Sequence, residues 1–145
     1  SHYADRMLWH DSTDTAVKVE EFKRASAGTV LVSPSLGTGY DFPGAAAEYQ
    51  VVAKIPYPDD RSALMRARKA ADKEYLVYLT AQSLVQICGR ICRSESDRGE
   101  TLCVDDRIRR LIGQYGHEIP DWWKRRYRRT QVVPDPPPRL EEAQP

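Results

Sequence analysis

Three polar residues, Gln86, Arg90 and Arg93, are the clearest candidates for chemistry in this sequence. A cap at Thr80 and the absence of proline predict a helix here, and the three residues then fall at i, i+4 and i+7 on one face. Two guanidinium groups about one turn apart repel each other unless an anion lies between them. Arginine suits phosphate oxygens because its planar fork binds them in bidentate fashion and stays charged. An ordinary solvated helix face is the alternative interpretation.

Glycines accompany these residues at two places. Gly89 lies beside the arginines, where the absence of a side chain lets another group come close. Upstream, a glycine-rich loop over residues 35–43 follows the β-branched apolar run 29–33, which we predict to be a central parallel strand. Open α/β sheets bind ligands at the carboxyl ends of such strands, because backbone N–H groups of the loop can approach a phosphate. A plain turn is the alternative.

The pattern Gln-x-x-Gly-Arg-x-x-Arg over residues 86–93 resembles motif VI of superfamily 2 helicases. The loop over residues 35–43 resembles motif V of the same proteins, and the continuation over 94–99 is similar to the DinG/XPD-like group. The resemblance covers roughly residues 5–112, and two linked motifs in the right order are more specific than either alone. It implies the C-terminal, second RecA-like domain of a helicase, an α/β fold of the P-loop-NTPase type. Its mostly parallel sheet would be flanked by helices and incomplete at the N-terminus.

The resemblance also implies roles for individual residues. Arg90 and Arg93 would reach the γ-phosphate of ATP as arginine fingers, and Gln86 would help to sense the nucleotide. The positions implied to lie near the nucleotide are Gly39, Asp41 and Gly89.

Two further loop positions, Gly37 and Thr38, would contact the nucleic-acid backbone by the same resemblance. The group commonly has Glu where this chain has Thr38, so the sequence departs from the motif there.

The sequence contains no Gly-x-x-x-x-Gly-Lys-Ser/Thr loop, which is the usual cradle for the β- and γ-phosphates. The resemblance therefore implies that ATP and Mg²⁺ are held mainly by a partner, an N-terminal RecA-like domain with the Walker A and B motifs. Single-stranded or forked DNA would be the substrate. We expect a fragment or one partner of a split enzyme, inactive alone, because the first strand and helix of the usual domain are missing before Ser1. Two alternatives are a non-catalytic nucleic-acid-binding or interaction module and a double-strand translocase domain.

The periodicity of the chain predicts an α/β order of elements. Asp14, Asp59–60 and Asp105 are the expected helix starts, and Gly113 is the expected end of the last of these helices. The predicted strands are 7–10, 29–33, 49–55 and 101–104, and the predicted helices are 15–25, 62–73, the motif VI helix and 107–112.

Composition sets the outer limits. The 145 residues suggest one domain over 1–131, followed by a proline-rich, disordered tail over 132–145. The net charge of +1 excludes a polyelectrolyte, so attraction to nucleic acid must come from local patches. No apolar run reaches the length of a membrane span and no signal peptide is recognised, so we expect no membrane partners. Free cysteines fit a reducing compartment, so we expect a cytoplasmic protein.

Two residue groups leave alternatives open. Cys88, Cys92 and Cys103 are read as buried thiols rather than metal ligands, because no further Cys or His completes a set, and we predict no metal site. Around Trp122 and Trp123, aromatic residues alternate with five Lys and Arg residues. Rings beside cations suit stacking on single-stranded nucleic acid, but the tryptophans could equally pack on the sheet edge while the arginines face water.

Overall fold

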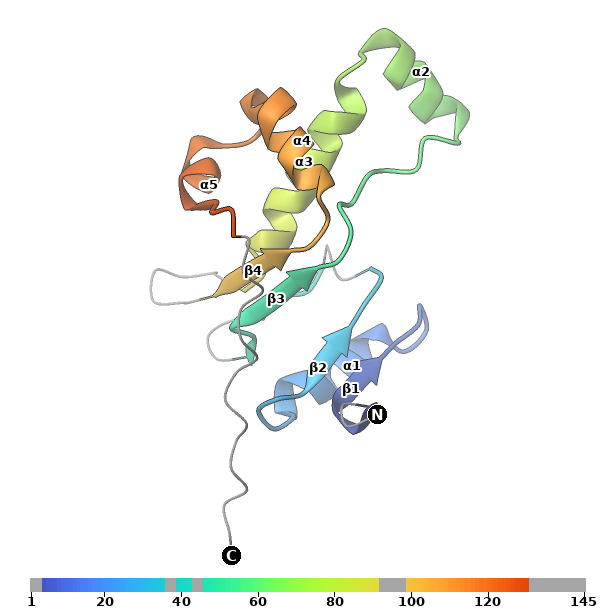
Figure 1. Cartoon of the computed structure of the whole chain (residues 1–145). Coiled ribbons are helices and arrows are strands. Elements are labelled where there is room, and N and C mark those ends of the chain that lie inside the picture. The colour runs from blue at the N-terminus through green and yellow to red at the C-terminus, as the bar shows by residue number, and fades with distance from the viewer. Residues whose placement is uncertain (1–3, 36–38, 43–45, 92–98, 131–145) are drawn as a thin grey trace, which may run out of the picture.

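The computed structural model describes residues 4–35, 39–42, 46–91 and 99–130, and the predicted tail lies outside them. Helices and strands alternate along the chain, as the sequence predicts, and Figure 1 shows their arrangement. The elements are η1 (Ala4–Arg6), β1 (Met7–Trp9), α1 (Thr15–Arg24), β2 (Val30–Val32), β3 (Tyr49–Val52), α2 (Ala63–Ala71), α3 (Tyr75–Cys88), β4 (Glu100–Cys103), α4 (Arg107–Tyr115), η3 (Gly116–Glu118) and α5 (Asp121–Arg126).

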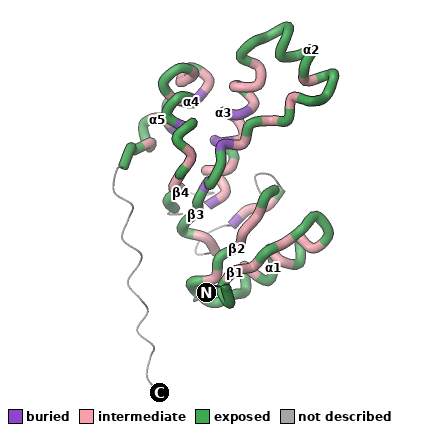
Figure 2. Tube along the Cα trace, turned by 45° about the vertical axis from the view of Figure 1, so that its right-hand side comes forward, coloured by how far each residue is buried: buried purple, intermediate pink, exposed green. Residues whose placement is uncertain are grey.

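The described strands form two parallel pairs. Strand β1 pairs with β2, with Leu8 opposite Leu31, and β3 pairs with β4, with Val51 opposite Leu102. Each pair is joined by a helical crossover, as parallel strands require. All four strands point the same way in Figure 1, and the two small sheets lie next to each other in Figures 1 and 2. The predicted fold class, α/β with parallel strands and flanking helices, is confirmed.

Most of the buried surface belongs to the unit formed by β3, β4, α3, α4 and α5, which we call the larger unit. Its apolar residues pack into one core, where the buried segments gather in Figure 2. The buried members of this core are Val52, Ile55, Ala81, Leu84, Ile108, Leu111, Ile119 and Trp123.

The smaller unit consists of β1, β2 and α1. Val19 of α1 is fully buried, while Val17 on the same helix is 68% exposed. Phe22 contacts Phe42 edge to face, with ring centroids 5.7 Å apart. Phe42 belongs to the motif V-like loop, so this loop packs against α1.

The motif VI helix begins earlier than the predicted cap at Thr80 and ends before Arg90. The helix α3 begins at Tyr75, and Thr80 is a buried residue within it whose Oγ1 donates a hydrogen bond to the Leu76 carbonyl. The apolar residues before Thr80 form the first turn because α3 packs against the core along most of its length. The helix ends at Cys88, since glycine at position 89 has low helix propensity.

The helix α4 also differs from its prediction. The Oδ1 atom of Asp105 accepts the Arg107 backbone N–H at 3.0 Å, which is consistent with the predicted start. Gly113 does not end the helix, which continues to Tyr115. Leu111, Ile112 and Tyr115 all contact the core, and this packing outweighs the low helix propensity of a single glycine.

Candidate nucleotide and nucleic-acid site

The glycine turn after β2 is the first part of the site. Gly39 has φ of +89°, a left-handed conformation that favours glycine, and no described atom lies within 4 Å of the position a Cβ would take. The space beside Gly39 is therefore unoccupied by described atoms, and phosphate binding by this turn stays a prediction. Gly37 and Thr38 lie outside the described residues.

Arg90 is the second part of the site, and its side chain lies against the turn. Its Nη1 atom donates to the Tyr40 carbonyl at 2.9 Å and to Oδ1 of Asp41 at 2.8 Å. The Arg90 side chain is only 16% exposed, whereas Asp41 is 41% exposed. The structure thus brings together Arg90 and Asp41, two residues that are 49 positions apart and that the sequence assigns to one site.

A backbone contact fixes the same two segments to each other. The Phe42 N–H donates to the Arg90 carbonyl at 3.2 Å, and Phe42 is buried at 8% exposure. The turn is therefore attached to the end of α3 through Arg90 and to α1 through the ring of Phe42.

The hydrogen bonding of Arg90 is incomplete within the described part of the chain. Its Nε atom is buried and has no acceptor there. A buried N–H without a partner is uncommon in native proteins and marks a place where a further acceptor would be stabilising. Sequence reasoning did not anticipate this, nor the role of the Tyr40 carbonyl, because a main-chain acceptor leaves no signal in residue types.

The other motif VI residues are less constrained. Gln86 lies on the last turn of α3 and is exposed. Gly89 is the C-cap residue, with φ of −75°, so its conformation is open to any residue. An added Cβ at Gly89 would meet the Val85 and Gln86 carbonyl oxygens at an ordinary 3.5 Å. Arg93 lies outside the described residues. The helix α3 ends at Cys88, so Gln86 lies within it and Arg90 lies beyond it. The two residues therefore do not share a helical face as predicted.

The described surface has two shallow hollows away from this site. One of about 840 Å³ lies over α1, and one of about 520 Å³ lies between Asp60 and α2. Neither is lined by Arg90 or Asp41.

The two described cysteines are free thiols. Cys88 and Cys103 are partly buried beside the core, and burial raises the pKa of both thiols. A raised pKa keeps them protonated and weakly reactive at neutral pH, in agreement with the thiol interpretation. Cys92 lies outside the described residues.

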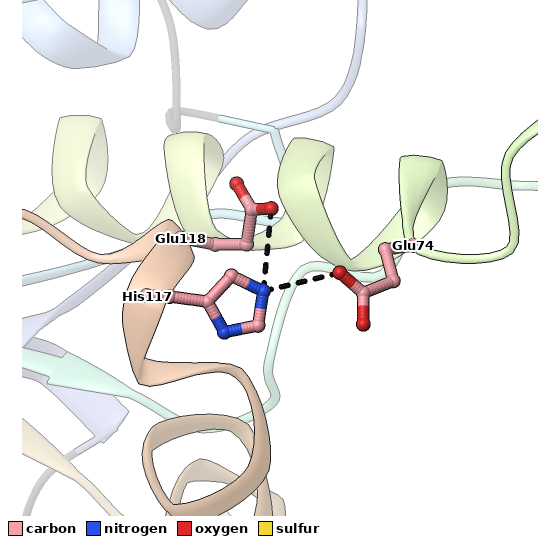
Figure 3. A group of neighbouring side chains, drawn as sticks. All are labelled: Glu74, His117 and Glu118. Atoms are coloured by element: carbon pink, nitrogen blue, oxygen red, sulfur yellow. Dashed lines mark hydrogen bonds and ion pairs between the residues drawn. The ribbon is translucent and has the colours of Figure 1, made fainter.

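One group of side chains that the sequence did not indicate lies at the surface of the larger unit (Figure 3). Nε2 of His117 lies 3.1 Å from Oε2 of Glu74 and 3.6 Å from Oε1 of Glu118. Imidazole and carboxylate are ligand types of divalent metals, and the same distances suit a protonated imidazole between two carboxylates. No local spacing could have revealed this group, because Glu74 precedes α3 and His117 lies 43 residues later.

The aromatic residues of α5 divide between its two faces. Trp123 is 9% exposed and stacks on Tyr127, with ring centroids 6.0 Å apart and an interplanar angle of 12°. Trp122 is 52% exposed. The packing interpretation therefore holds for Trp123 and Tyr127, while Trp122 lies at the surface beside the arginines.

None of the helices in the described ranges combines the length and the apolar character that crossing a membrane requires.

Comparisons with known proteins agree with the two motifs. The chain matches the model of the helicase C-terminal domain family over residues 2–126. It is 27% identical over 126 residues to the general transcription and DNA repair factor IIH helicase subunit XPD of Dictyostelium discoideum, covering 77% of this chain and 16% of that protein. It is 29% identical over 126 residues to the ATP-dependent helicase DinG of Mycobacterium tuberculosis, covering 79% of this chain and 18% of that protein.

A third relative, the 3'-5' exonuclease DinG of Staphylococcus aureus, is 29% identical over 94 residues, covering 62% of this chain and 10% of that protein. The chain thus spans less than a fifth of the length of each of these three relatives. The family match covers most of the chain and includes both the glycine turn and the Arg90 segment. The chain therefore belongs to the helicase C-terminal domain family, in the group that contains DinG and XPD.

Proposed function

We propose that this chain is the second motor domain of an ATP-dependent DNA helicase and supplies Arg90 and Arg93 to an ATP site completed by a P-loop domain. The single observation that carries the proposal is the contact between Arg90 and the glycine turn. The two segments that resemble motifs V and VI form one site through the Arg90–Asp41 ion pair of 2.8 Å. The names of the relatives, which include ATP-dependent helicases and a DNA repair factor, support ATP and DNA as the ligands.

The donor set of the site fits a phosphate. Arginine offers phosphate a planar fork of N–H donors, and Nε of Arg90 has no acceptor among the described residues. The guanidinium of Arg90 therefore makes only part of the hydrogen bonds that it can make among the described residues. Replacing its present acceptors with phosphate oxygens, which accept in bidentate fashion, would cost little free energy.

The residues of the site then have separate tasks. Arg90 stabilises the charge that spreads over the transferred phosphoryl group, and Asp41 and the Tyr40 carbonyl hold the guanidinium in position until it is used. Gly89 and Gly39 leave space for the nucleotide, since neither position carries a Cβ. Bound ATP supplies the phosphoryl group, and Mg²⁺ would be held by the P-loop domain.

The same contact offers a route from ATP to nucleic acid. Gly37 and Thr38 precede Gly39 in the turn, and the turn is attached to Arg90 through both a side chain and a backbone hydrogen bond. A change in the position of Arg90 would therefore move the turn that is proposed to contact the nucleic-acid backbone.

The test is the ATP turnover of the complete enzyme with Arg90→Ala. We expect turnover to fall by roughly 10³-fold or more, as for related arginine fingers, while ATP still binds. Arg90→Lys keeps the charge but loses the planar fork, so its turnover should also stay low. The matched control is Arg24→Ala, because the side chain of Arg24 lies on α1 and is 82% exposed.

Full turnover by the Arg90→Ala enzyme would contradict the proposal. Loss of ATP binding together with a changed circular dichroism spectrum would assign Arg90 a structural role instead. The measurements are steady-state ATP hydrolysis and titration with a fluorescent ATP analogue.

A further inference from the structure

The helix α5 presents an exposed aromatic ring, Trp122, among several basic residues. The segment from Asp121 to Thr130 contains five basic residues and one acidic residue, Asp121. In Figures 1 and 2 the helix lies at the margin of the molecule, where it is open to solvent.

The arrangement on the helix is specific. Trp122 is 52% exposed, and Arg125 and Arg126 follow it at i+3 and i+4, so all three lie on one side of α5. The opposite side is held by Trp123, which is buried in the core and stacked on Tyr127. The exposed ring is therefore mounted on a rigid support.

The positive charges of this segment outnumber its one acidic residue, Asp121. Asp121 is bound by Lys124 at 2.8 Å, and this contact, with a smaller contribution from the charge of Arg125, lowers the pKa of the Asp121 carboxyl. No ion pair with a carboxylate is found for Arg125, Arg126 or Arg129 within the described ranges.

Arg128 is used in part by the fold, because its Nη1 donates to the Arg125 and Tyr127 carbonyls at the end of the helix. Among the described residues, Arg126 and Arg129 thus have no carboxylate within ion-pair distance, and Arg125 interacts with Asp121 only at longer range.

We propose that Trp122, Arg125 and Arg126 form a binding surface for single-stranded nucleic acid. A base would stack on the exposed indole, and the two arginines would bind the phosphates on either side. Stacking needs an exposed flat ring and phosphate binding needs unpaired cations, and α5 supplies both within one turn. None of these three side chains takes part in the hydrogen bonds between Arg90 and the glycine turn.

An anionic membrane is the other partner that such a composition suggests, but the structure disfavours it. A membrane-binding helix needs one apolar face to insert, with its cations on the opposite face. In α5 the apolar face is already occupied, since Trp123 contributes to the core of the larger unit, and the helix has only six residues.

The experiment uses the 145-residue chain and a fluorescein-labelled oligo-dT of about 15 nucleotides, with oligo-rU of equal length as the RNA counterpart. Binding is measured by fluorescence anisotropy, and quenching of tryptophan emission is recorded with the unlabelled oligonucleotide. We expect the wild-type chain to bind and its emission to fall. Trp122→Ala should bind about tenfold more weakly and lose the quenching, because stacking on one ring is lost. Trp122→Phe should recover most of the binding.

The matched control is Trp9→Ala, because Trp9 is 62% exposed and lies on β1 without an arginine cluster. Its binding should equal that of the wild type. The double variant Arg125→Ala/Arg126→Ala should reduce the slope of log affinity against log salt by about 1.4, as expected for two phosphate contacts on a single strand.

Equal binding by the wild type and Trp122→Ala would overturn the proposal, as would equal losses in Trp122→Ala and Trp9→Ala. Binding to vesicles of phosphatidylserine and phosphatidylcholine, with no binding to either oligonucleotide, would assign the surface to membranes. The experiment contains neither ATP nor a P-loop domain, so its failure would leave the proposed role of Arg90 untouched.

Discussion

The two units of this domain differ sharply in how they bury apolar side chains. In the larger unit three helices share one core with β3 and β4, and Ile55, Leu84 and Leu111 are each 1% exposed. In the smaller unit a single helix covers β1 and β2, and Val30 and Trp9 remain 50% and 62% exposed. Since stability scales roughly with buried apolar area, the larger unit must supply most of the folding free energy.

The glycine turn lies where the two units meet. Phe42 packs on Phe22 of the smaller unit, and the Phe42 N–H binds the Arg90 carbonyl of the larger unit. A segment placed between a well-packed unit and a loosely packed one can move without disrupting the main core. We therefore expect the proposed ATP-responsive contact, between Arg90 and the glycine turn, to move more easily than the core of the larger unit.

Core truncation tests this difference most directly and has the largest expected effect on stability. Leu84→Ala should lower the free energy of unfolding by about 2–5 kcal/mol, because it opens a cavity in the shared core. Val19→Ala in the smaller unit should cost about 1–3 kcal/mol, since less apolar volume is removed. Urea unfolding followed by circular dichroism measures both.

Hydrogen exchange sharpens the same comparison. In the Val19→Ala chain, amides of α1 should exchange faster while those of α3 keep their protection. Equal acceleration in both helices would show that the two units unfold as one and do not differ in local stability.

Asp105 tests a polar link within the larger unit and has a smaller expected effect. Its Oδ2 accepts the Ile55 N–H at 2.8 Å, and the carboxylate also pairs with Arg107, so the segment after β3 is tied to the start of α4. The Arg107 hydrogen bonds, followed by the Ile55 N–H, hold the pKa of Asp105 well below its ordinary value. Asp105→Asn should therefore lower the urea midpoint at pH 7, by less than Leu84→Ala does.

The pH dependence of this effect has a definite sign. A depressed pKa in the folded state contributes stability above the ordinary carboxyl pKa of about 3.9, and this stability is lost as the pH falls through the folded value. The difference between wild type and Asp105→Asn should thus be constant near neutral pH and shrink below about pH 4. Asp106→Asn is the control, because the Asp106 side chain makes no capping hydrogen bond. A difference that grew on acidification would contradict the assignment.

The group around His117 has the smallest expected effect. It also belongs to the larger unit, but His117 is 57% exposed and Glu74 is 49% exposed. Solvent-exposed ion pairs contribute about 0–1 kcal/mol, so His117→Ala should change the free energy of unfolding by less than about 1 kcal/mol. A loss comparable with that of Leu84→Ala would mean that surface charge, and not the buried core, sets the stability of this unit.

The fold was largely predictable because apolar periodicity marks the faces that must be buried. The strands at 30–32 and 49–52 and the helix from Thr15 follow directly from it. The limits of α3 and α4 were not predictable in this way. Thr80 has the residue type of a cap and Gly113 that of a terminator, but packing of the neighbouring residues against the core decided both positions.

The sequence predicted which residues form the candidate site better than it predicted the hydrogen bonds between them. The resemblance to motifs V and VI singled out Asp41 and Arg90, and the structure joins these two residues in an ion pair. The role of the Tyr40 carbonyl and the lack of an acceptor for Nε of Arg90 among the described residues carry no residue-type signal, because both depend on the folded geometry. The two tryptophans of α5 were inseparable in the sequence because their difference arises only from which side of a short helix meets the core.

The hydrogen bond from the Phe42 N–H to the Arg90 carbonyl is made entirely by main-chain atoms. Exchanging either side chain for another leaves this donor and this acceptor in place, apart from proline at position 42, which lacks the N–H. A variant at position 90 can therefore lose the proposed role of the guanidinium in ATP hydrolysis and still keep the main-chain hydrogen bond to the turn.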